Sequence, residues 1–352
     1  NRIDVSMEYY NTKTKDVIWN KALPVINGAF SPDGGPKANY TTNLNMCETS
    51  NKGFELALNT RNIITKNFTW SSSVTFNHNK EKITKLSGGD SDVLNNGDTG
   101  YALALGEAIN SYYHYKLDGV WQKGEETDAA VFGAAPGDLK INIPNLVKES
   151  DGRFYKIDEE TGSAAVDENG NVIYYTSDNK YTPSDADYQI LGHNSPDWSL
   201  GFQNNFTWKD FDLSVFVYAR YGQMFAYDML TSYDPKGIRN FPTYFNYWTE
   251  NNPSNDFPAA NANKGLEQYT GYYALRYVDG SFIKIKNITL GYSLPKSILK
   301  SAGIEKCRFY ATITNPFVFA KSHLLKDYDP EMNGSLKYPL TKQFVFGVNV
   351  TF

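Results

Sequence analysis

The segment QFVFGVNVTF, residues 343 to 352, alternates in side-chain character from one residue to the next. Because successive side chains of a β-strand point to opposite faces, one face of this segment is wholly apolar and carries Phe344, Phe346, Val348, Val350 and Phe352. The opposite face carries Gln343, Val345, Gly347, Asn349 and Thr351. A strand of this kind fits either the edge of a soluble sheet or the last strand of a barrel in lipid, and the remaining sequence distinguishes the two.

The composition favours a β-protein and excludes helical membrane proteins. No apolar run of the 352 residues approaches the roughly 18 that a membrane-spanning helix needs. A transmembrane β-barrel escapes this test, because its strands alternate apolar and polar residues and average out as hydrophilic. The aromatic fraction of 15% suits the aromatic girdles of such barrels, although aromatic-rich soluble β-proteins also exist.

Charge and cysteine content exclude further classes. The net charge of −5 and the scattered Lys and Arg provide no basic stripe, so we expect no nucleic-acid partner. Cys47 and Cys307 are too few for a disulfide framework, and we expect two unpaired thiols. The sequence begins at Asn1 inside a strand-like segment without a signal peptide, so we expect a mature fragment or a piece of a longer chain.

Alternating segments recur along the whole chain. They predict about eight antiparallel strands, over residues 2–11, 52–64, 67–80, 197–208, 211–221, 281–294, 306–315 and 342–352. In a soluble sandwich the polar faces would meet water and the apolar faces a second sheet. Here the polar faces are rich in Ser, Thr, Asn and Gln rather than Lys and Glu, which favours a water-filled lumen.

The connections between these strands are of two unequal kinds. Short ones alternate with long ones, the long ones covering residues 12–50, 82–196, 222–280 and 316–341. Short turns at one end and long loops at the other are typical of outer-membrane barrels. We therefore expect the C-terminus and the short turns on the periplasmic side, and 82–196 and 222–280 as long extracellular loops. The same parity requires an even number of strand crossings between residues 81 and 196, and we expect none.

Ten segments in order resemble the C-terminal part of SusC/RagA-type TonB-dependent transporters. They are YYNTKTKDVIW (9–19), SNKGFELALN (50–59), NFTWSSSVTFNHNKEKI (67–83), YKLDGVWQ (115–122), APGDLKI (135–141), ILGHNSPDWSLGFQNNFTWKDFDLSVFVYARYG (190–222), IKIKNITLGYSLPKSI (283–298), TNPFVFAK (314–321), DYDPEM (327–332) and YPLTKQFVFGVNVTF (338–352). The most specific are KNITLGYSLPK and the run from YPL to the final Phe. Residues 142–189 match least, because the chain has an insertion where the family has a short connection.

The resemblance implies an all-β fold, in which residues 1–352 are the C-terminal segment of a transmembrane barrel of roughly 22 strands. The plug domain and the N-terminal strands would lie outside this chain. A closed barrel of eight strands is the alternative, disfavoured because such large loops would crown an interior filled by side chains. The terminal strand, with Phe344, Phe346, Val348, Val350 and Phe352, would face lipid and act as an assembly signal.

The resemblance also implies a function and partners. The expected function is TonB-dependent import of a nutrient across the outer membrane of a Gram-negative bacterium. A glycan or oligosaccharide is the first expectation for the cargo, and an oligopeptide is the second. The expected partners are a SusD-like surface lipoprotein as a lid, TonB acting through the N-terminal part, and outer-membrane lipid; a dimer of transporter–lipoprotein pairs is left open.

The sequence contains no constellation that predicts an enzyme or a metal centre. Its four histidines are dispersed and form no HExxH or Cys/His motif. The stretch VDENGN (166–171) resembles a calcium loop, but Ala165 occupies the first ligand position, so we expect a turn, with a bound calcium ion as the alternative. Because nucleophile and phosphate-binding motifs are also missing, we predict no enzyme and no cofactor; a carbohydrate-active enzyme would need a carboxylate pair.

Aromatic residues in the loop 222–280 are the candidates for contact with cargo or a partner. Aromatic planes cover the apolar faces of sugars, while amides and carboxylates bond to hydroxyls, and a peptide would suit such a surface nearly as well. Each ring has the alternative role of packing the loop against its neighbours. The candidates are Tyr233, Tyr244, Tyr247, Trp248, Tyr272 and Tyr273.

The alternative function is that of a non-transporting surface β-protein, such as an adhesin or a glycan-binding module. Such a protein would carry charged residues on the second face of its strands and no terminal aromatic residue, and the sequence shows neither property.

Overall fold

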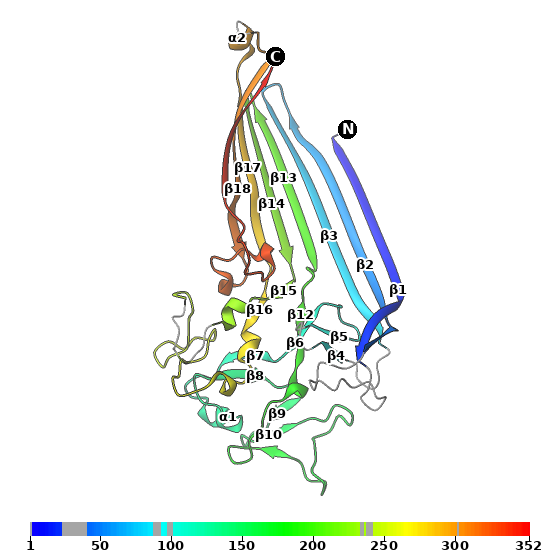
Figure 1. Ribbon diagram of the computed structural model, residues 1–352, viewed down its shortest axis with the longest axis vertical. Helices are drawn as coiled ribbons and strands as arrows, with labels where there is room; N and C mark the ends of the chain where they lie inside the picture. The colour runs from blue at the N-terminus through cyan, green and yellow to red at the C-terminus, as the bar shows by residue number, and fades with distance from the viewer. Residues whose placement is uncertain are drawn as a thin grey trace.

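The chain folds around one large antiparallel sheet. The computed structural model describes residues 2–22, 41–86, 93–96, 101–232, 236, 242–300 and 303–352. Eight strands form this sheet, each paired with the next along the chain (Figure 1). They are β1 (Ile3–Ala22), β2 (Thr41–Ile64), β3 (Phe68–Leu86), β13 (Trp198–Trp208), β14 (Phe211–Tyr221), β17 (Phe282–Ser293), β18 (Lys306–Ala320) and β19 (Gln343–Thr351). The predicted set of about eight antiparallel strands is confirmed.

The first strands are longer than the alternation predicts. Residues 12–22 and 41–50, expected in a loop, continue the β1–β2 ladder as far as Ala22 opposite Thr41. The expectation was wrong because these extensions lack a continuous apolar face, so the sequence loses its alternation while the backbone pairing persists.

The long segment between β3 and β13 adds no strand to the large sheet. β3 pairs directly with β13, from Phe68 opposite Trp208 to His78 opposite Trp198. The described part of the segment forms smaller elements: β4 (Val93–Asn96), β5 (Tyr101–Ala104), β6 (Ser111–His114), β7 (Lys116–Val120), α1 (Glu126–Val131), β8 (Leu139–Asn142), β9 (Leu146–Lys148), β10 (Phe154–Lys156), β11 (Tyr174–Tyr175) and β12 (Gln189–His193). The small sheet of β9, β10 and β11 belongs to the insertion at 142–189.

Two further connections complete the loop end of the molecule. β15 (Met224–Ala226) pairs with β16 (Tyr277–Asp279) within the connection from β14 to β17. Short 3₁₀ helices include η5 (Tyr272–Arg276), η7 (His323–Leu325) and η8 (Pro330–Met332). We call the described residues of 101–196, 222–280 and 321–342 the loop assembly. It lies at one end of the sheet. The C-terminus, the short turns and α2 (Lys296–Leu299) lie at the other end (Figure 1).

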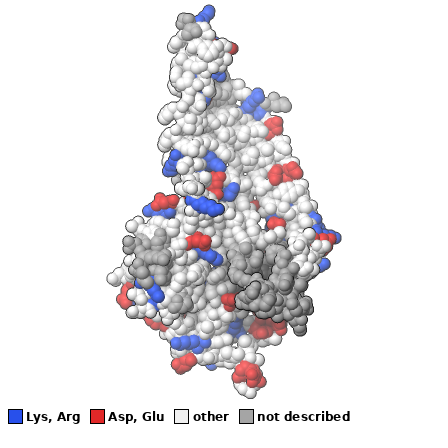
Figure 2. All heavy atoms as spheres, viewed as in Figure 1, with Lys and Arg blue, Asp and Glu red and all other residues white. Residues whose placement is uncertain are grey.

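One face of the large sheet is apolar and exposed. The exposed fractions of Phe346, Met7 and Ile283 are 80%, 69% and 53%. Figure 2 shows few charged side chains on the visible surface of the sheet and more of them around the loops. Soluble monomers rarely expose apolar patches of this extent, so the face requires an apolar environment.

Aromatic rows border this apolar face at both ends. Near the loops, one cross-strand row contains Tyr9, Phe54, Trp198 and Tyr221. Near the short turns, a second row contains Phe68, Trp208, Phe211, Tyr292 and Phe309. The 11 residues of β14 run from one row to the other and cover about 35 Å, enough for a tilted strand to cross a hydrocarbon core.

A polar cluster interrupts the apolar face and is internally satisfied. The Ser72 hydroxyl donates to Asn204 Oδ1 at 2.7 Å, and Trp70 Nε1 donates to the same oxygen at 3.0 Å. Because polar groups transferred out of water are costly unless they are hydrogen-bonded, this mutual pairing explains why Ser72 is tolerated there.

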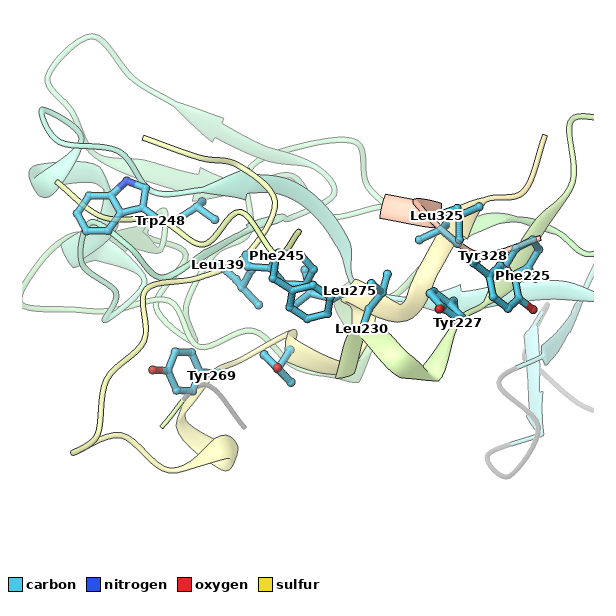
Figure 3. Close-up of a cluster of buried hydrophobic side chains, with 14 residues drawn as sticks. Leu139, Phe225, Tyr227, Leu230, Phe245, Trp248, Tyr269, Leu275, Leu325 and Tyr328 are labelled. Carbon is cyan, nitrogen blue, oxygen red and sulfur yellow. The ribbon is translucent and has the colours of Figure 1, made fainter. Parts of the chain in front are cut away.

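The largest hydrophobic core lies in the loop assembly (Figure 3). Its buried side chains come from three connections that are far apart in sequence. They are Val120, Leu139, Phe225, Tyr227, Leu230, Phe245, Trp248, Phe257, Tyr269, Tyr272, Leu275, Val278, Leu325 and Tyr328. The three connections therefore pack against one another around a shared core and are not independent loops.

The glycine at 334 provides a test of this packing. Its φ is +83°, and a Cβ added there would overlap the carbonyl oxygen of Ala226. Gly170 has the same φ of +83°, but its added Cβ would meet nothing within 4 Å. We expect Gly334→Ala to destabilise the folded protein by about 1–3 kcal/mol more than Gly170→Ala. Thermal unfolding in detergent measures the difference, and equal melting temperatures would show that the β18–β19 connection does not pack on β15.

Candidate functional site

The loop assembly contains a cavity of about 370 Å³ between β7, β12, β15 and η5. This volume lies within the usual range for small-molecule sites. The apolar part of its wall includes Leu117, Ile190, Leu191, Met224, Leu275 and Leu324. Its polar lining comes from Tyr115, Lys116, Asn255, Asp256 and Tyr277. An apolar wall with a few polar groups is the composition of a site that binds an organic ligand.

Hydrogen bonds hold the polar side of the cavity in place. Asn255 Oδ1 accepts from the Val120 amide at 3.1 Å and from Gln122 Nε2 at 3.0 Å. Asp256 Oδ2 lies 3.0 Å from His323 Nε2. The side chains that a ligand would meet are therefore oriented in advance, which lowers the entropic cost of binding.

The aromatic candidates fall into different environments. Trp248 and Tyr272 belong to the hydrophobic core, with exposed fractions of 8% and 1%, and Trp248 Nε1 donates to Gln122 Oε1 at 2.9 Å. Tyr244 packs edge-on against Phe245 with ring centroids 5.2 Å apart. Tyr233 lies outside the described residues.

Tyr247 and Tyr273 are the candidates on the surface, with exposed fractions of 42% and 53%. Each of the two is close, along the chain or by a backbone bridge, to a residue that lines the cavity. Tyr273 precedes Ala274, which lines the cavity, and the backbone of Tyr247 bridges to Phe257, the neighbour of the lining residue Asp256. Sequence alone does not separate Tyr272 from Tyr273, because adjacent residues of a helical turn point in different directions.

His114 belongs to an aromatic cluster beside the cavity. Its ring stacks on Tyr188 at 4.8 Å and lies 5.7 Å from Tyr277. Burial and the nearby Arg276 guanidinium lower the pKa of His114 to about 4. The imidazole is therefore neutral at neutral pH, and its Nδ1 accepts from the Tyr115 amide at 2.8 Å.

Neither the His114 cluster nor an ionic contact between β17 and η8 was predicted from the sequence. The Lys284 ammonium is buried and lies 2.5 Å from Asp329 Oδ2 and 2.8 Å from Glu331 Oε2. Lys286 lies 2.6 Å from Glu331 Oε1. Burial alone would raise the pKa of Glu331, but the bonds from both lysines lower it, so the carboxylate is charged. The acidic residues of the DYDPEM segment could have indicated this contact, because buried carboxylates require cationic partners elsewhere in the chain.

The polar face of the large sheet forms a hydrophilic wall. Arg308 makes two hydrogen bonds to Asp212, of 2.8 and 2.5 Å, and Asn77 Nδ2 donates to Glu55 Oε1 at 2.8 Å. A hollow of about 260 Å³ on this face is lined by residues that include Ser6, Glu8, Glu55, Asn77 and Tyr218. Asp212 and Arg308 thus form an ion pair on this wall, and Glu55 is bonded to a neutral amide.

The remaining sequence motifs are structural. Residues 166–172 form a tight turn, as expected, in which Asp167 Oδ1 accepts from the amides of Asn169 and Asn171. Cys47 and Cys307 are free and buried. Among the described residues, no group of three or more His, Cys, Asp or Glu is placed to hold a metal ion. No helix in the described part of the chain is long and apolar enough to cross a membrane.

An eight-stranded antiparallel sheet with one apolar face, one polar face and an aromatic row at each end defines part of a large transmembrane β-barrel. A scan against protein-family models finds no match. TonB-dependent receptor P3 of Formosa agariphila is 28% identical over 374 aligned positions, covering 100% of this chain and 32% of the relative. TonB-dependent receptor SusC of Bacteroides thetaiotaomicron is 26% identical, covering 100% of this chain and 30% of the relative.

Solved structures show the same fold. A chain of the RagAB peptide transporter superimposes with a TM-score of 0.70 at 23% identity, covering 100% of this chain and 34% of the solved one. A chain of the RagAB peptide importer in its closed-closed state gives 0.69 at 22% identity, again with 34% of the solved chain covered.

Over its whole length, the chain is similar in sequence to a part of TonB-dependent receptors, SusC among them, and its fold matches a part of a chain in the RagAB structures. It spans about a third of the length of the curated relatives that it matches. The receptors that the chain matches are transporters and not enzymes.

The Lys284 network yields a stability prediction. Lys284→Met leaves two largely buried carboxylates without their shared partner, which we expect to cost about 3–5 kcal/mol. Lys286→Met is the matched control, because Lys286 is 30% exposed and its loss should cost at most about 1 kcal/mol. Thermal unfolding and proteolysis at residues 321–342 measure both variants. Equal stability of the two would contradict the assigned role of Lys284.

His114 yields a pH prediction. Because its folded pKa lies below the unfolded value of 6.5, the unfolded chain takes up a proton before the folded one. Its contribution to stability is complete above pH 6.5 and is lost as the pH falls toward 4. We expect the loop assembly to become more sensitive to protease over this interval, and His114→Phe to flatten the profile. An unchanged profile in the variant would assign the pH dependence to other groups.

Proposed function

We propose that this chain supplies part of the barrel wall and of the extracellular loops of a receptor that imports a nutrient across the outer membrane. The observation that carries the proposal is the exposed apolar face of the large sheet, bordered by aromatic rows and opposed by a polar face. Hydrocarbon covers the first face and water in the lumen wets the second.

The edges of the sheet support a larger barrel. Among the described strands, β1 and β19 each pair on one side only. Unpaired backbone groups in hydrocarbon cost several kcal/mol each, so further strands of the whole receptor cover both edges. The terminal strand, with Phe344, Phe346, Val348, Val350 and Phe352, then faces lipid and serves as the assembly signal.

The orientation follows from the lengths of the connections. The short turns and the C-terminus lie in the periplasm, and the loop assembly lies outside the cell. The long loops expected at 82–196 and 222–280 are thus extracellular, apart from residues 82–86, which belong to β3. A SusD-like lipoprotein closes over the loop assembly, and TonB drives transport through the N-terminal part of the receptor. The chain itself performs no covalent chemistry.

A glycan or oligosaccharide is our first proposal for the cargo. Tyr247 and Tyr273 expose ring surface for sugar faces, and Asn246 and Asn252 place amides beside Tyr247; Asn252 Nδ2 donates to the Tyr247 carbonyl at 2.9 Å. An oligopeptide is the second proposal, because the apolar wall of the 370 Å³ cavity suits hydrophobic side chains.

The alternative of a non-transporting adhesin requires a second layer over the apolar face. No described element covers that face, which favours the transporter.

Depletion of cargo from the medium tests the function. Cells with and without the full-length receptor are offered a mixture of oligosaccharides or a mixture of oligopeptides, and mass spectrometry follows each pool. Import requires depletion that depends on the receptor and stops on addition of an uncoupler. Depletion of neither pool would reject nutrient import of these two classes.

Substitution of the exposed tyrosines tests the contact surface. Loss of one stacked ring costs about 1 kcal/mol, so we expect Tyr247→Ala and Tyr273→Ala each to weaken cargo affinity about fivefold to tenfold. Tyr338→Ala is the control, because Tyr338 is 95% exposed and lies outside the loop 222–280. If Tyr247→Ala and Tyr273→Ala both bind cargo with the affinity of wild type, as the control does, these two tyrosines do not contact the cargo.

A further inference from the structure

Four lysines gather on the apolar side of the sheet, just beyond the aromatic row near the loops. Lys52 lies directly opposite Lys80, and Ser50 lies between Lys13 and Lys82 in the next outward-facing row. The register of β1, β2 and β3 is regular from Tyr9, Phe54 and His78 to these positions, so the lysines share the face of the aromatic row. We call Lys13, Lys52, Lys80 and Lys82 the lysine patch; all four are exposed.

Three of the four lysines, Lys52, Lys80 and Lys82, line a hollow that also contains aromatic side chains. The hollow has a volume of about 380 Å³ and is lined by Tyr9, Ser50, Lys52, Gly53, Phe54, His78, Lys80 and Lys82. Aromatic rings therefore meet ammonium groups within one depression, which suits a ligand that is apolar at one end and anionic at the other.

The positive charge of the patch is not paired in salt bridges among the described residues, although Lys80 lines a second hollow together with Glu107 and Asp197. On these strands Glu8, Glu55 and Glu81 have the opposite parity and lie on the polar face. Glu48 pairs with Lys85 at 3.7 Å, and Asp16 lies at the irregularity of β1 beyond Lys13. Like charges directly opposite each other across strands are destabilising, so Lys52 and Lys80 favour an anion between them.

The height of the patch matches that of lipid headgroups. β13 and β14 end at the aromatic row, whereas β1, β2 and β3 continue past it. Lys52 and Lys80 stand two residues beyond the row, about 7 Å along the strand, and Lys13 and Lys82 about 13 Å. Aromatic belts mark the interface of a membrane, so groups just beyond them meet the headgroup phosphates.

We propose that the lysine patch binds an anionic lipid of the outer leaflet whose headgroup carries more than one phosphate. The ammonium groups bond to the phosphates, and Tyr9 and Phe54 contact the first methylenes of the acyl chains. Two rows of lysines at two heights suit two phosphates better than one. This inference rests on the proposed placement in the outer membrane; the lipid is a structural ligand of the barrel wall and not cargo.

Lipid binding by the full-length receptor tests the proposal. The probe is diphosphoryl lipid A in neutral detergent micelles, with phosphatidylethanolamine micelles and inorganic phosphate as separate arms. The quadruple variant Lys13→Gln, Lys52→Gln, Lys80→Gln, Lys82→Gln is compared with Lys123→Gln, Lys180→Gln, Lys326→Gln, Lys337→Gln, which removes four exposed lysines from the loops.

We expect the patch variant to bind diphosphoryl lipid A about tenfold or more weakly than wild type, and the control variant to bind it unchanged. Added salt should weaken wild-type binding. Equal binding by the two variants overturns the proposal, and so does equal occupancy by inorganic phosphate, because a free anion would then suffice. A receptor that is soluble without detergent would instead overturn the membrane placement, so the two failures are distinguishable.

Discussion

The backbone pairing of the large sheet is the constraint on which the rest of the structure depends. In hydrocarbon no water is present to bond to a free N–H or C=O, so every strand must find its partner on both sides. The six inner strands of the sheet meet this requirement with their neighbours along the chain, whereas β1 and β19 each have one described partner. The alternation of side chains then follows, because each strand has one face toward lipid and one toward the lumen.

Two-residue periodicity made much of this sheet predictable. Trp198 to Trp208 and Phe211 to Tyr221 carry clean apolar faces, and their observed bounds match the expected strands within a residue. The parity of short and long connections predicted that the segment between β3 and β13 adds no strand to the large sheet, although residues 82–86, expected in a loop, extend β3. The extensions of β1 and β2 escaped prediction because pairing there depends on backbone geometry that leaves no pattern in polar side chains.

The loop assembly was far less predictable, because its order comes from contacts between distant segments. Trp248 and Tyr272 are adjacent in sequence to Tyr247 and Tyr273. Trp248 and Tyr272 are nevertheless buried, whereas Tyr247 and Tyr273 are exposed. The partners that decide this lie elsewhere, as with Gln122, which accepts the Trp248 indole N–H. Lys284 and Glu331 illustrate the same limit, since 47 positions separate them in sequence and only the fold brings them together.

The composition of the hydrophobic core also constrains how the protein is made. Val120 and Leu139 come from one connection, Phe245 and Tyr272 from another, and Leu325 from a third. Contacts between such distant segments carry a large loop-closure entropy and form late. The core can close only when all three connections lie at the same end of the sheet. Burial of the core therefore indicates that the strands between these connections have paired. A receptor stalled during assembly would display these aromatic side chains to the quality-control proteases of its compartment.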